Sequence, residues 1–133
     1  MREFHLKIAT PDGPVFDGNA ESLLVRTDSG DVEIMAGHAD YFAPVGVGIS
    51  KVKANGNVKI ASCSGGFVSV FGGEVNLACT TFEFADSIDI ARARDAKERA
   101  EETISKSNDD KIIKIAKAKL MRAITRINAA ELK

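Results

Sequence analysis

The hydrophobic period of this sequence changes once, at Asp86 and Ser87. Before this point, short runs alternate apolar and polar residues, and turn-forming residues separate them roughly every ten positions. After it, residues rich in Ala, Arg, Glu and Lys follow a helical period. A period of two is typical of strands that bury one face. The sequence therefore predicts an α+β fold, with a β domain over residues 1–85 and a helical domain over residues 86–133.

The first part predicts an all-β sandwich or flattened barrel of about ten short strands, eight at the least. Its first strand runs from Phe4 to Thr10. Asn55-Gly56 is the strongest hairpin signal, because both central positions of a type I′ turn need positive φ. Two glycine pairs, at residues 65–66 and 72–73, are interpreted as further turns. Aromatic side chains gather at strand positions and are assigned to the core, namely Phe4, Phe16, Tyr41, Phe42, Phe67, Phe71, Phe82 and Phe84.

The second part predicts two helices, the first ending near Ile104 and the second, after a polar turn at residues 105–110, ending near Ala130. Such a short connection makes the helices antiparallel. Their facing residues are mainly alanines on the first helix and isoleucines on the second. Because this contact buries little apolar surface, the hairpin should be marginally stable and detachable.

Charge separates the two parts. Residues 1–85 contain 10 acidic and 6 basic residues, a net charge of −4, whereas residues 86–133 contain 9 acidic and 12 basic residues, a net charge of +3. A nucleic-acid-binding surface would need more positive charge than this.

The sequence contains no targeting segment and no run of the ~20 apolar residues that cross a bilayer. An intracellular protein without a transmembrane segment is therefore expected.

Few residues could take part in catalysis or redox chemistry. The sequence contains no nucleophile, nucleotide-loop or metal-ligand motif, which argues against an enzyme and against a metal site. His5 and His38 are interpreted as hydrogen-bonded or solvated side chains. Cys63 and Cys79 lie in strand-like apolar runs, which indicates two buried thiols, although a disulfide between neighbouring strands remains open.

Arginines recur at helical spacing in the second part. Asp89, Arg92 and Arg99 lie near one face of the first helix, and Arg122 and Arg126 are four apart on the second. If the helices fold back on each other, the four arginines converge and suit an oligoanion such as a nucleotide phosphate. Judged by spacing alone, a solvated basic face is the better interpretation.

Four segments, in order along the whole chain, resemble the epsilon subunit family of bacterial F-type ATP synthases. They are residues 10–18 (TPDGPVFDG), 30–39 (GDVEIMAGHA), 64–70 (SGGFVSV) and 88–102 (IDIARARDAKERAEE). The resemblance implies a non-catalytic rotor subunit of a proton-translocating synthase, peripheral on the cytoplasmic face of the bacterial plasma membrane. Its sandwich would bind gamma and the c-ring. Its hairpin would be compact with ATP bound, or extended into the alpha/beta hexamer to inhibit hydrolysis.

The resemblance to Bacillus-type members also implies a regulatory ATP site that does not require magnesium. The family pattern and its accompanying positions match Glu83, Ile88, Asp89, Arg92, Ala93, Arg99, Arg122 and Arg126. The sequence departs from the family around residues 35–42. Candidate contacts with the c-ring or gamma, which could equally be solvated loop residues, are Asp31, Glu33 and His38. The alternative function is a stand-alone β-sandwich sensor of a nucleotide or another polyanion.

Overall fold

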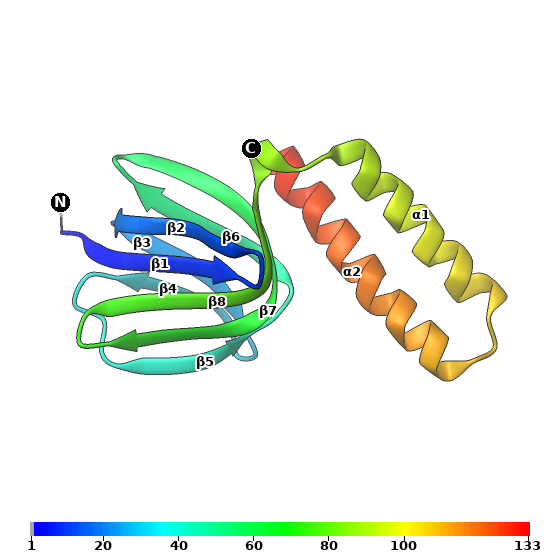
Figure 1. The fold of residues 1–133 in the computed structure, drawn as a ribbon, viewed down its shortest axis with the longest axis horizontal. Coiled ribbons are helices and arrows are strands. Elements are labelled where there is room, and N and C mark those ends of the chain that lie inside the picture. Colours follow the sequence, from blue (N-terminus) through cyan, green and yellow to red (C-terminus); the bar gives the residue numbers. More distant parts are fainter. Residues whose placement is uncertain (1) are drawn as a thin grey trace.

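The computed structural model describes residues 2–133, in which a β-sandwich precedes two antiparallel helices (Figure 1). A 3-10 turn at Ala85–Ser87 joins the last strand to the first helix. The predicted class, a sandwich followed by a helical hairpin, is confirmed. The elements are β1 (Phe4–Thr10), β2 (Gly13–Ala20), β3 (Ser22–Thr27), β4 (Gly30–Met35), β5 (Tyr41–Val45), β6 (Gly48–Ala54), β7 (Asn57–Phe71), β8 (Glu74–Phe84), α1 (Ile90–Lys106) and α2 (Asp110–Leu132).

The strands form one sheet path in the order β2-β1-β8-β7-β5-β3-β4, and β6 closes the sandwich by pairing with both β3 and β7. The β1–β8 pair is parallel and the other pairs are antiparallel. The first half of β7 pairs with β6 and its second half pairs with β5. The described residues form eight strands, the lower end of the predicted eight to ten, and β7, with 15 residues, takes the place of two shorter strands.

The change of partner along β7 occurs at Gly65 and Gly66, where Gly65 and Thr80 are left out of the β7–β8 pairing. Both glycines have positive φ, 63° and 129°. A Cβ on Gly66 would lie 1.9 Å from the carbonyl oxygen of Ala78, so only glycine fits. The interpretation of this pair as a turn is wrong, because it bends a continuous strand. The other two glycine-containing hairpins, after β6 and after β7, are confirmed.

The main core lies inside the sandwich, where alternate residues of the strands are fully buried. Its largest completely buried side chains are Leu6, Ile8, Leu23, Ile34 and Leu77, and Phe4 and Phe82 are almost completely buried. Three aromatic residues assigned to the core lie outside it instead, since Phe42, Phe67 and Phe71 are 67%, 53% and 76% exposed. They occupy the outward positions of β5 and β7. Apolar residues lie on both faces of these strands, so the sequence pattern did not identify which face is buried.

The two helices pack against each other through alanines. The buried residues of α1 are Ala93 and Ala100, and α2 buries Ala116 and Ala123 among others. The isoleucines of α2 expected in this contact are not among its buried residues: Ile113, Ile124 and Ile127 are partly buried and Ile112 is exposed. Small residues allow the helix axes to approach closely but bury little apolar area.

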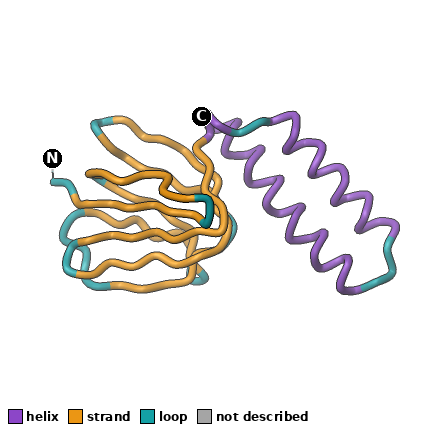
Figure 2. The backbone as a smooth tube through the Cα atoms, viewed as in Figure 1, coloured by secondary structure: helices purple, strands orange, loops and turns teal. Residues whose placement is uncertain are grey.

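The hairpin touches the sandwich near its base, and its other end projects away from the strands (Figure 2). Ile88, Ala129 and Ala130 form a small buried cluster there, separate from the main core. Three isoleucines, Ile49, Ile60 and Ile90, pack against this cluster. The C-terminus thereby returns to the junction at which α1 begins (Figure 1). No helix among residues 2–133 is long and apolar enough to cross a membrane.

Candidate anion-binding site between the sandwich and the hairpin

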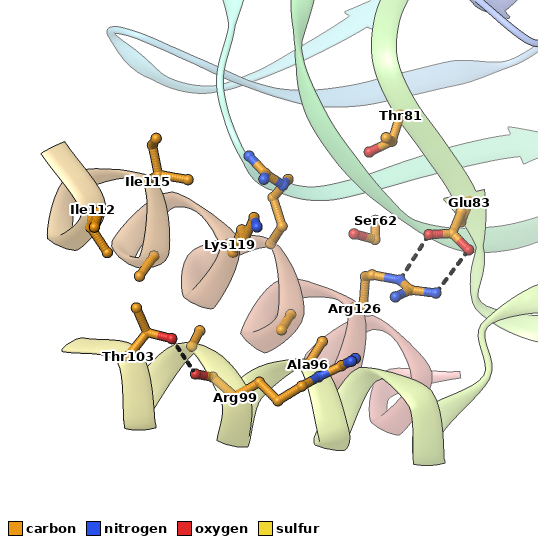
Figure 3. Close-up of a pocket in the computed structure, with 14 residues that line it drawn as sticks. Ser62, Thr81, Glu83, Ala96, Arg99, Thr103, Ile112, Ile115, Lys119 and Arg126 are labelled. Carbon is orange, nitrogen blue, oxygen red and sulfur yellow. Dashed lines mark hydrogen bonds and ion pairs between the residues drawn. The ribbon is translucent and has the colours of Figure 1, made fainter. Parts of the chain in front are cut away.

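A cavity of about 590 Å³ lies between the end of the β7–β8 ribbon and both helices (Figure 3). Its volume falls in the range of small-molecule sites, roughly 300–1,000 Å³. The strands contribute Ser62, Thr81 and Glu83, and α1 contributes Ala96, Arg99, Ala100 and Thr103. The wall from α2 consists of Ile112, Ile115, Ala116, Lys119, Arg122, Ala123 and Arg126. Because two strands and both helices form its walls, the cavity exists only while the hairpin is folded against the sandwich.

Helical spacing aligns the α2 side chains along the cavity, since residues three or four apart lie on one face. The isoleucines, Ile112 and Ile115, lie toward the free end of the hairpin, and Arg126 lies beside the sandwich (Figure 3). Lys119 and Arg122 fall between them in the sequence. The wall thus changes from apolar to basic along its length. Such a wall suits an amphiphilic ligand with an anionic group.

Arg126 forms an ion pair with Glu83 across the gap between α2 and β8. Nη2 donates a hydrogen bond to Oε2 at 3.2 Å, and Nε lies 2.8 Å from Oε1 (Figure 3). The second contact is short, but the Nε–H is poorly aligned with its acceptor and forms no directed hydrogen bond, so we treat it as electrostatic. The side chains are 23% and 34% exposed. This ion pair links α2 to β8 at the end of the cavity that lies beside the sandwich.

The cavity has an excess of positive charge. Its lining holds four basic side chains and one carboxylate, that of Glu83. Among residues 2–133, no ion pair within 4.0 Å involves Arg99, Lys119 or Arg122. These three cations come from both helices and are available to an anionic ligand.

The eight residues assigned to an ATP site fall into two groups. Glu83, Arg99, Arg122 and Arg126 line the cavity together. The other four belong to the start of α1 and do not line it. Asp89 caps α1 by accepting a hydrogen bond from the backbone N–H of Arg92 at 3.1 Å. Ile88 and Ala93 are buried, and the Arg92 side chain is exposed.

Sequence reasoning did not assign Ser62, Thr81, Thr103 or Lys119 to the site, although all four line the cavity. Thr81 precedes Glu83 by two residues and therefore lies on the same face of β8, a signal that could have identified it. Lys119 precedes Arg122 by three residues on α2 and was detectable in the same way. Ser62 faces Glu83 across the β7–β8 pair, and only the strand register reveals this.

The three candidate contact residues for gamma or the c-ring do not form one cluster. Asp31 lies near the first end of β4, where it pairs with Arg26 at 3.4 Å, and Glu33 is exposed in the middle of that strand. His38 lies beyond the other end of β4, where its ring makes an edge-to-face contact with Tyr41 at 5.6 Å between centroids. No group of three or more metal-ligating side chains capable of holding a metal occurs in the described part of the chain.

Comparison with known proteins identifies the family to which this chain belongs. Residues 3–85 match the family described as "ATP synthase, Delta/Epsilon chain, beta-sandwich domain", and residues 86–131 match its "long alpha-helix domain". The chain therefore belongs to the delta/epsilon chain family of ATP synthase. Within it, the chain is of the epsilon type and is a non-catalytic subunit of the complex. The whole-chain match sets aside the alternative of a stand-alone sensor.

The relatives and structural neighbours are consistent with this family. The "ATP synthase epsilon chain" of Bacillus velezensis is 40% identical over 98% of both chains, and that of Bacillus subtilis is 38% identical over the same share. A chain in the mitochondrial ATP synthase of Euglena gracilis has a TM-score of 0.83 at 22% identity, covering 98% of this chain and 82% of that one. A chain in the central stalk and c-ring structure of Tetrahymena thermophila has a TM-score of 0.67 at 16% identity, with 97% of both chains covered. The two structures share the fold of this protein.

Proposed function

We propose that this subunit couples gamma to the c-ring in a proton-translocating synthase and senses ATP through its helical hairpin. The observation that carries the ATP proposal is the basic cavity, whose cations come from α1 and α2 and whose floor comes from β7 and β8. Three of these cations have no acidic partner within the described chain. A triphosphate would neutralise them, so ATP binding would favour the compact hairpin.

ATP would bind without a required magnesium ion. The single carboxylate of the cavity lining, Glu83, already pairs with Arg126, and the phosphate charge would be balanced by guanidinium and ammonium groups. In proteins, Mg²⁺ is usually bound by carboxylates and phosphates. In this cavity, arginine side chains would contact the phosphates in place of Mg²⁺. Calorimetric titration with ATP in the presence of a chelator should therefore give the same affinity as titration with added magnesium.

When ATP is scarce, the hairpin would lose this stabilisation and extend along gamma into the alpha/beta hexamer, inhibiting hydrolysis. The small contact between hairpin and sandwich supports this step, because the cluster buried at the base contains one isoleucine and two alanines, Ile88, Ala129 and Ala130. The complete synthase would hold the subunit at the cytoplasmic face of the bacterial plasma membrane, as a peripheral rotor component.

Gamma would bind an aromatic patch formed by Phe42, Phe67 and Phe71 on the outward face of β5 and β7. The rings of Phe42 and Phe67 stack at 5.4 Å between centroids although both are largely exposed. Exposed apolar clusters of this kind mark protein interfaces. Replacing Phe42 and Phe67 with serine should abolish co-purification with gamma. Val58→Ser, which also removes an exposed apolar side chain from β7, is the matched control and should leave co-purification intact.

The ATP site is tested by comparing two substitutions on α2. Arg122→Gln removes an unpaired cation from the cavity and should weaken ATP binding about tenfold, the loss of one charge-assisted phosphate contact. Lys117→Gln removes the same charge from an exposed position outside the cavity and should leave the affinity unchanged. Arg92→Gln tests whether the nucleotide also reaches the start of α1. Equal affinities for the wild type, Arg122→Gln and Arg99→Gln would refute binding in this cavity.

A further inference from the structure

Two thiols meet inside the sandwich. Cys63 on β7 and Cys79 on β8 are 1% and 4% exposed, and their Sγ atoms lie 3.3 Å apart. The two residues do not face each other in the strand register, because Cys63 is opposite Phe82 and Cys79 is opposite Gly66. The bend in β7 between them, which requires glycine, accompanies this approach of the sulfurs. The juxtaposition is therefore a product of the bend and not of ordinary cross-strand pairing.

The surroundings of the two sulfurs make them chemically different. A hydrogen bond from the Cys79 thiol lowers the pKa of Cys63 despite the opposite effect of burial, and the nearby hydroxyl of Ser50 lowers it further. That hydroxyl is fully buried and has no hydrogen-bond partner of ordinary geometry among the described residues. The hydrogen bond that Cys79 makes to Cys63, and burial in addition, raise the pKa of Cys79. Since the thiolate is the reactive form of cysteine, Cys63 is the nucleophile of the pair.

We propose that Cys63 and Cys79 are a reversible oxidation site that closes to an intramolecular disulfide when the protein meets hydrogen peroxide. The Cys63 thiolate attacks one peroxide oxygen and breaks the O–O bond, which leaves a sulfenic acid and a hydroxide that takes up a proton to form water. The Cys79 sulfur then attacks the Cys63 sulfur and displaces a second water, which carries away the Cys79 proton. Two thiols lose two electrons, and one peroxide becomes two waters.

The geometry requires only a small movement and a local opening. The sulfurs must approach from 3.3 Å to the bond length of about 2.05 Å. Gly65 and Thr80, the residues left out of the β7–β8 ladder, lie within two positions of the cysteines. A local opening of the ribbon there would admit peroxide, which is close to water in size.

The disulfide would crosslink the two strands that form the floor of the basic cavity. Ser62 precedes Cys63, and Thr81 follows Cys79 by two residues. The crosslink would therefore hold these two side chains at a fixed separation beneath α2. This inference stands on the sandwich alone and does not depend on ATP binding or on the hairpin.

The test treats the full chain with hydrogen peroxide, removes the peroxide with catalase, and alkylates the remaining thiols with iodoacetamide in denaturant. The expected product is a monomer that has lost the mass of two hydrogen atoms, carries no alkyl group and yields one Cys63–Cys79 crosslinked peptide. Dithiothreitol should restore two alkylatable thiols. Two alkylated thiols after treatment, a covalent dimer, or a sulfinic acid without a crosslink would each overturn the proposal.

Single-cysteine variants identify the attacking sulfur. In Cys79→Ser, the serine hydroxyl can still donate to Cys63, and the sulfenic acid formed there should be trapped by dimedone because no resolving thiol is present. In Cys63→Ser, the remaining Cys79 should give no dimedone adduct. Labelling of Cys79 instead would overturn the assignment of Cys63 as nucleophile. The wild-type mass measurement decides on the disulfide itself even if one variant fails to fold.

Discussion

Neutralising Glu83 should loosen the attachment of α2 to the sandwich. The ion pair with Arg126 has one directed hydrogen bond at 3.2 Å and one close contact at 2.8 Å, with both side chains partly exposed. A hydrogen bond to a charged group contributes about 1.5–3 kcal/mol, and a fully exposed ion pair about 0.2–1 kcal/mol. With solvent screening of these partly exposed groups, we expect Glu83→Gln to cost about 1 kcal/mol, which is about a fivefold change in the ratio of docked to undocked hairpin.

Amide hydrogen exchange at Ala129 and Ala130 follows this ratio, because both lie near the end of α2, which we expect to fray once its packing at the base is lost. Their exchange should accelerate about fivefold in Glu83→Gln. A double-mutant cycle with Arg126→Gln should give a coupling free energy of about 1 kcal/mol. Glu102→Gln is the control, since it breaks an exposed ion pair within α1. A coupling below about 0.3 kcal/mol, or an equal effect of the control, would refute the reasoning.

Three further expectations concern the sandwich. A chain ending at Ala85 should keep the circular dichroism spectrum of a β-sheet protein, because the main core contains no helical residue; an unfolded spectrum would contradict this. Hydrogen bonds to Asp17 and Glu74 raise the pKa of His5 above 6.5. The stabilisation of the folded state by these hydrogen bonds is complete below pH 6.5 and disappears as the pH rises through the raised pKa of His5. His5→Gln should therefore remove this part of the pH dependence of the melting temperature. Gly66→Ala should lower the free energy of unfolding by more than about 2 kcal/mol in urea titrations, because the new Cβ would clash with β8.

Local sequence signals predicted the elements well and their contacts less well. The Asn55-Gly56 hairpin follows from the conformational needs of two residues, which are visible in the sequence. The role of Gly66 does not follow, because the same residue type serves turns and close backbone approaches, and only the neighbouring strand distinguishes them. Alternation could not identify Phe67 as exposed, since apolar residues occupy both faces of β7 there. Helical spacing grouped Arg99 with Arg92, yet only Arg99 reaches the cavity, because the depth of a side chain depends on how the hairpin docks.

The Glu83–Arg126 ion pair and the proposed effect of the ligand contribute similar free energies to docking of the hairpin, and this similarity would allow regulation. A ligand that binds only the docked state stabilises it by RT ln(1 + [L]/Kd), about 1.4 kcal/mol at ten times Kd. The Glu83–Arg126 pair contributes about 1 kcal/mol, and the buried cluster at the base consists of one isoleucine and two alanines, with three partly buried isoleucines packed against it. If the docked state were much more stable, ATP could not change the population of compact hairpin. Because alanines provide most of the buried contact between α1 and α2, the hairpin can separate at a moderate cost. The low apolar content of these interfaces is thus the property that would allow a change in ATP concentration to control the hairpin.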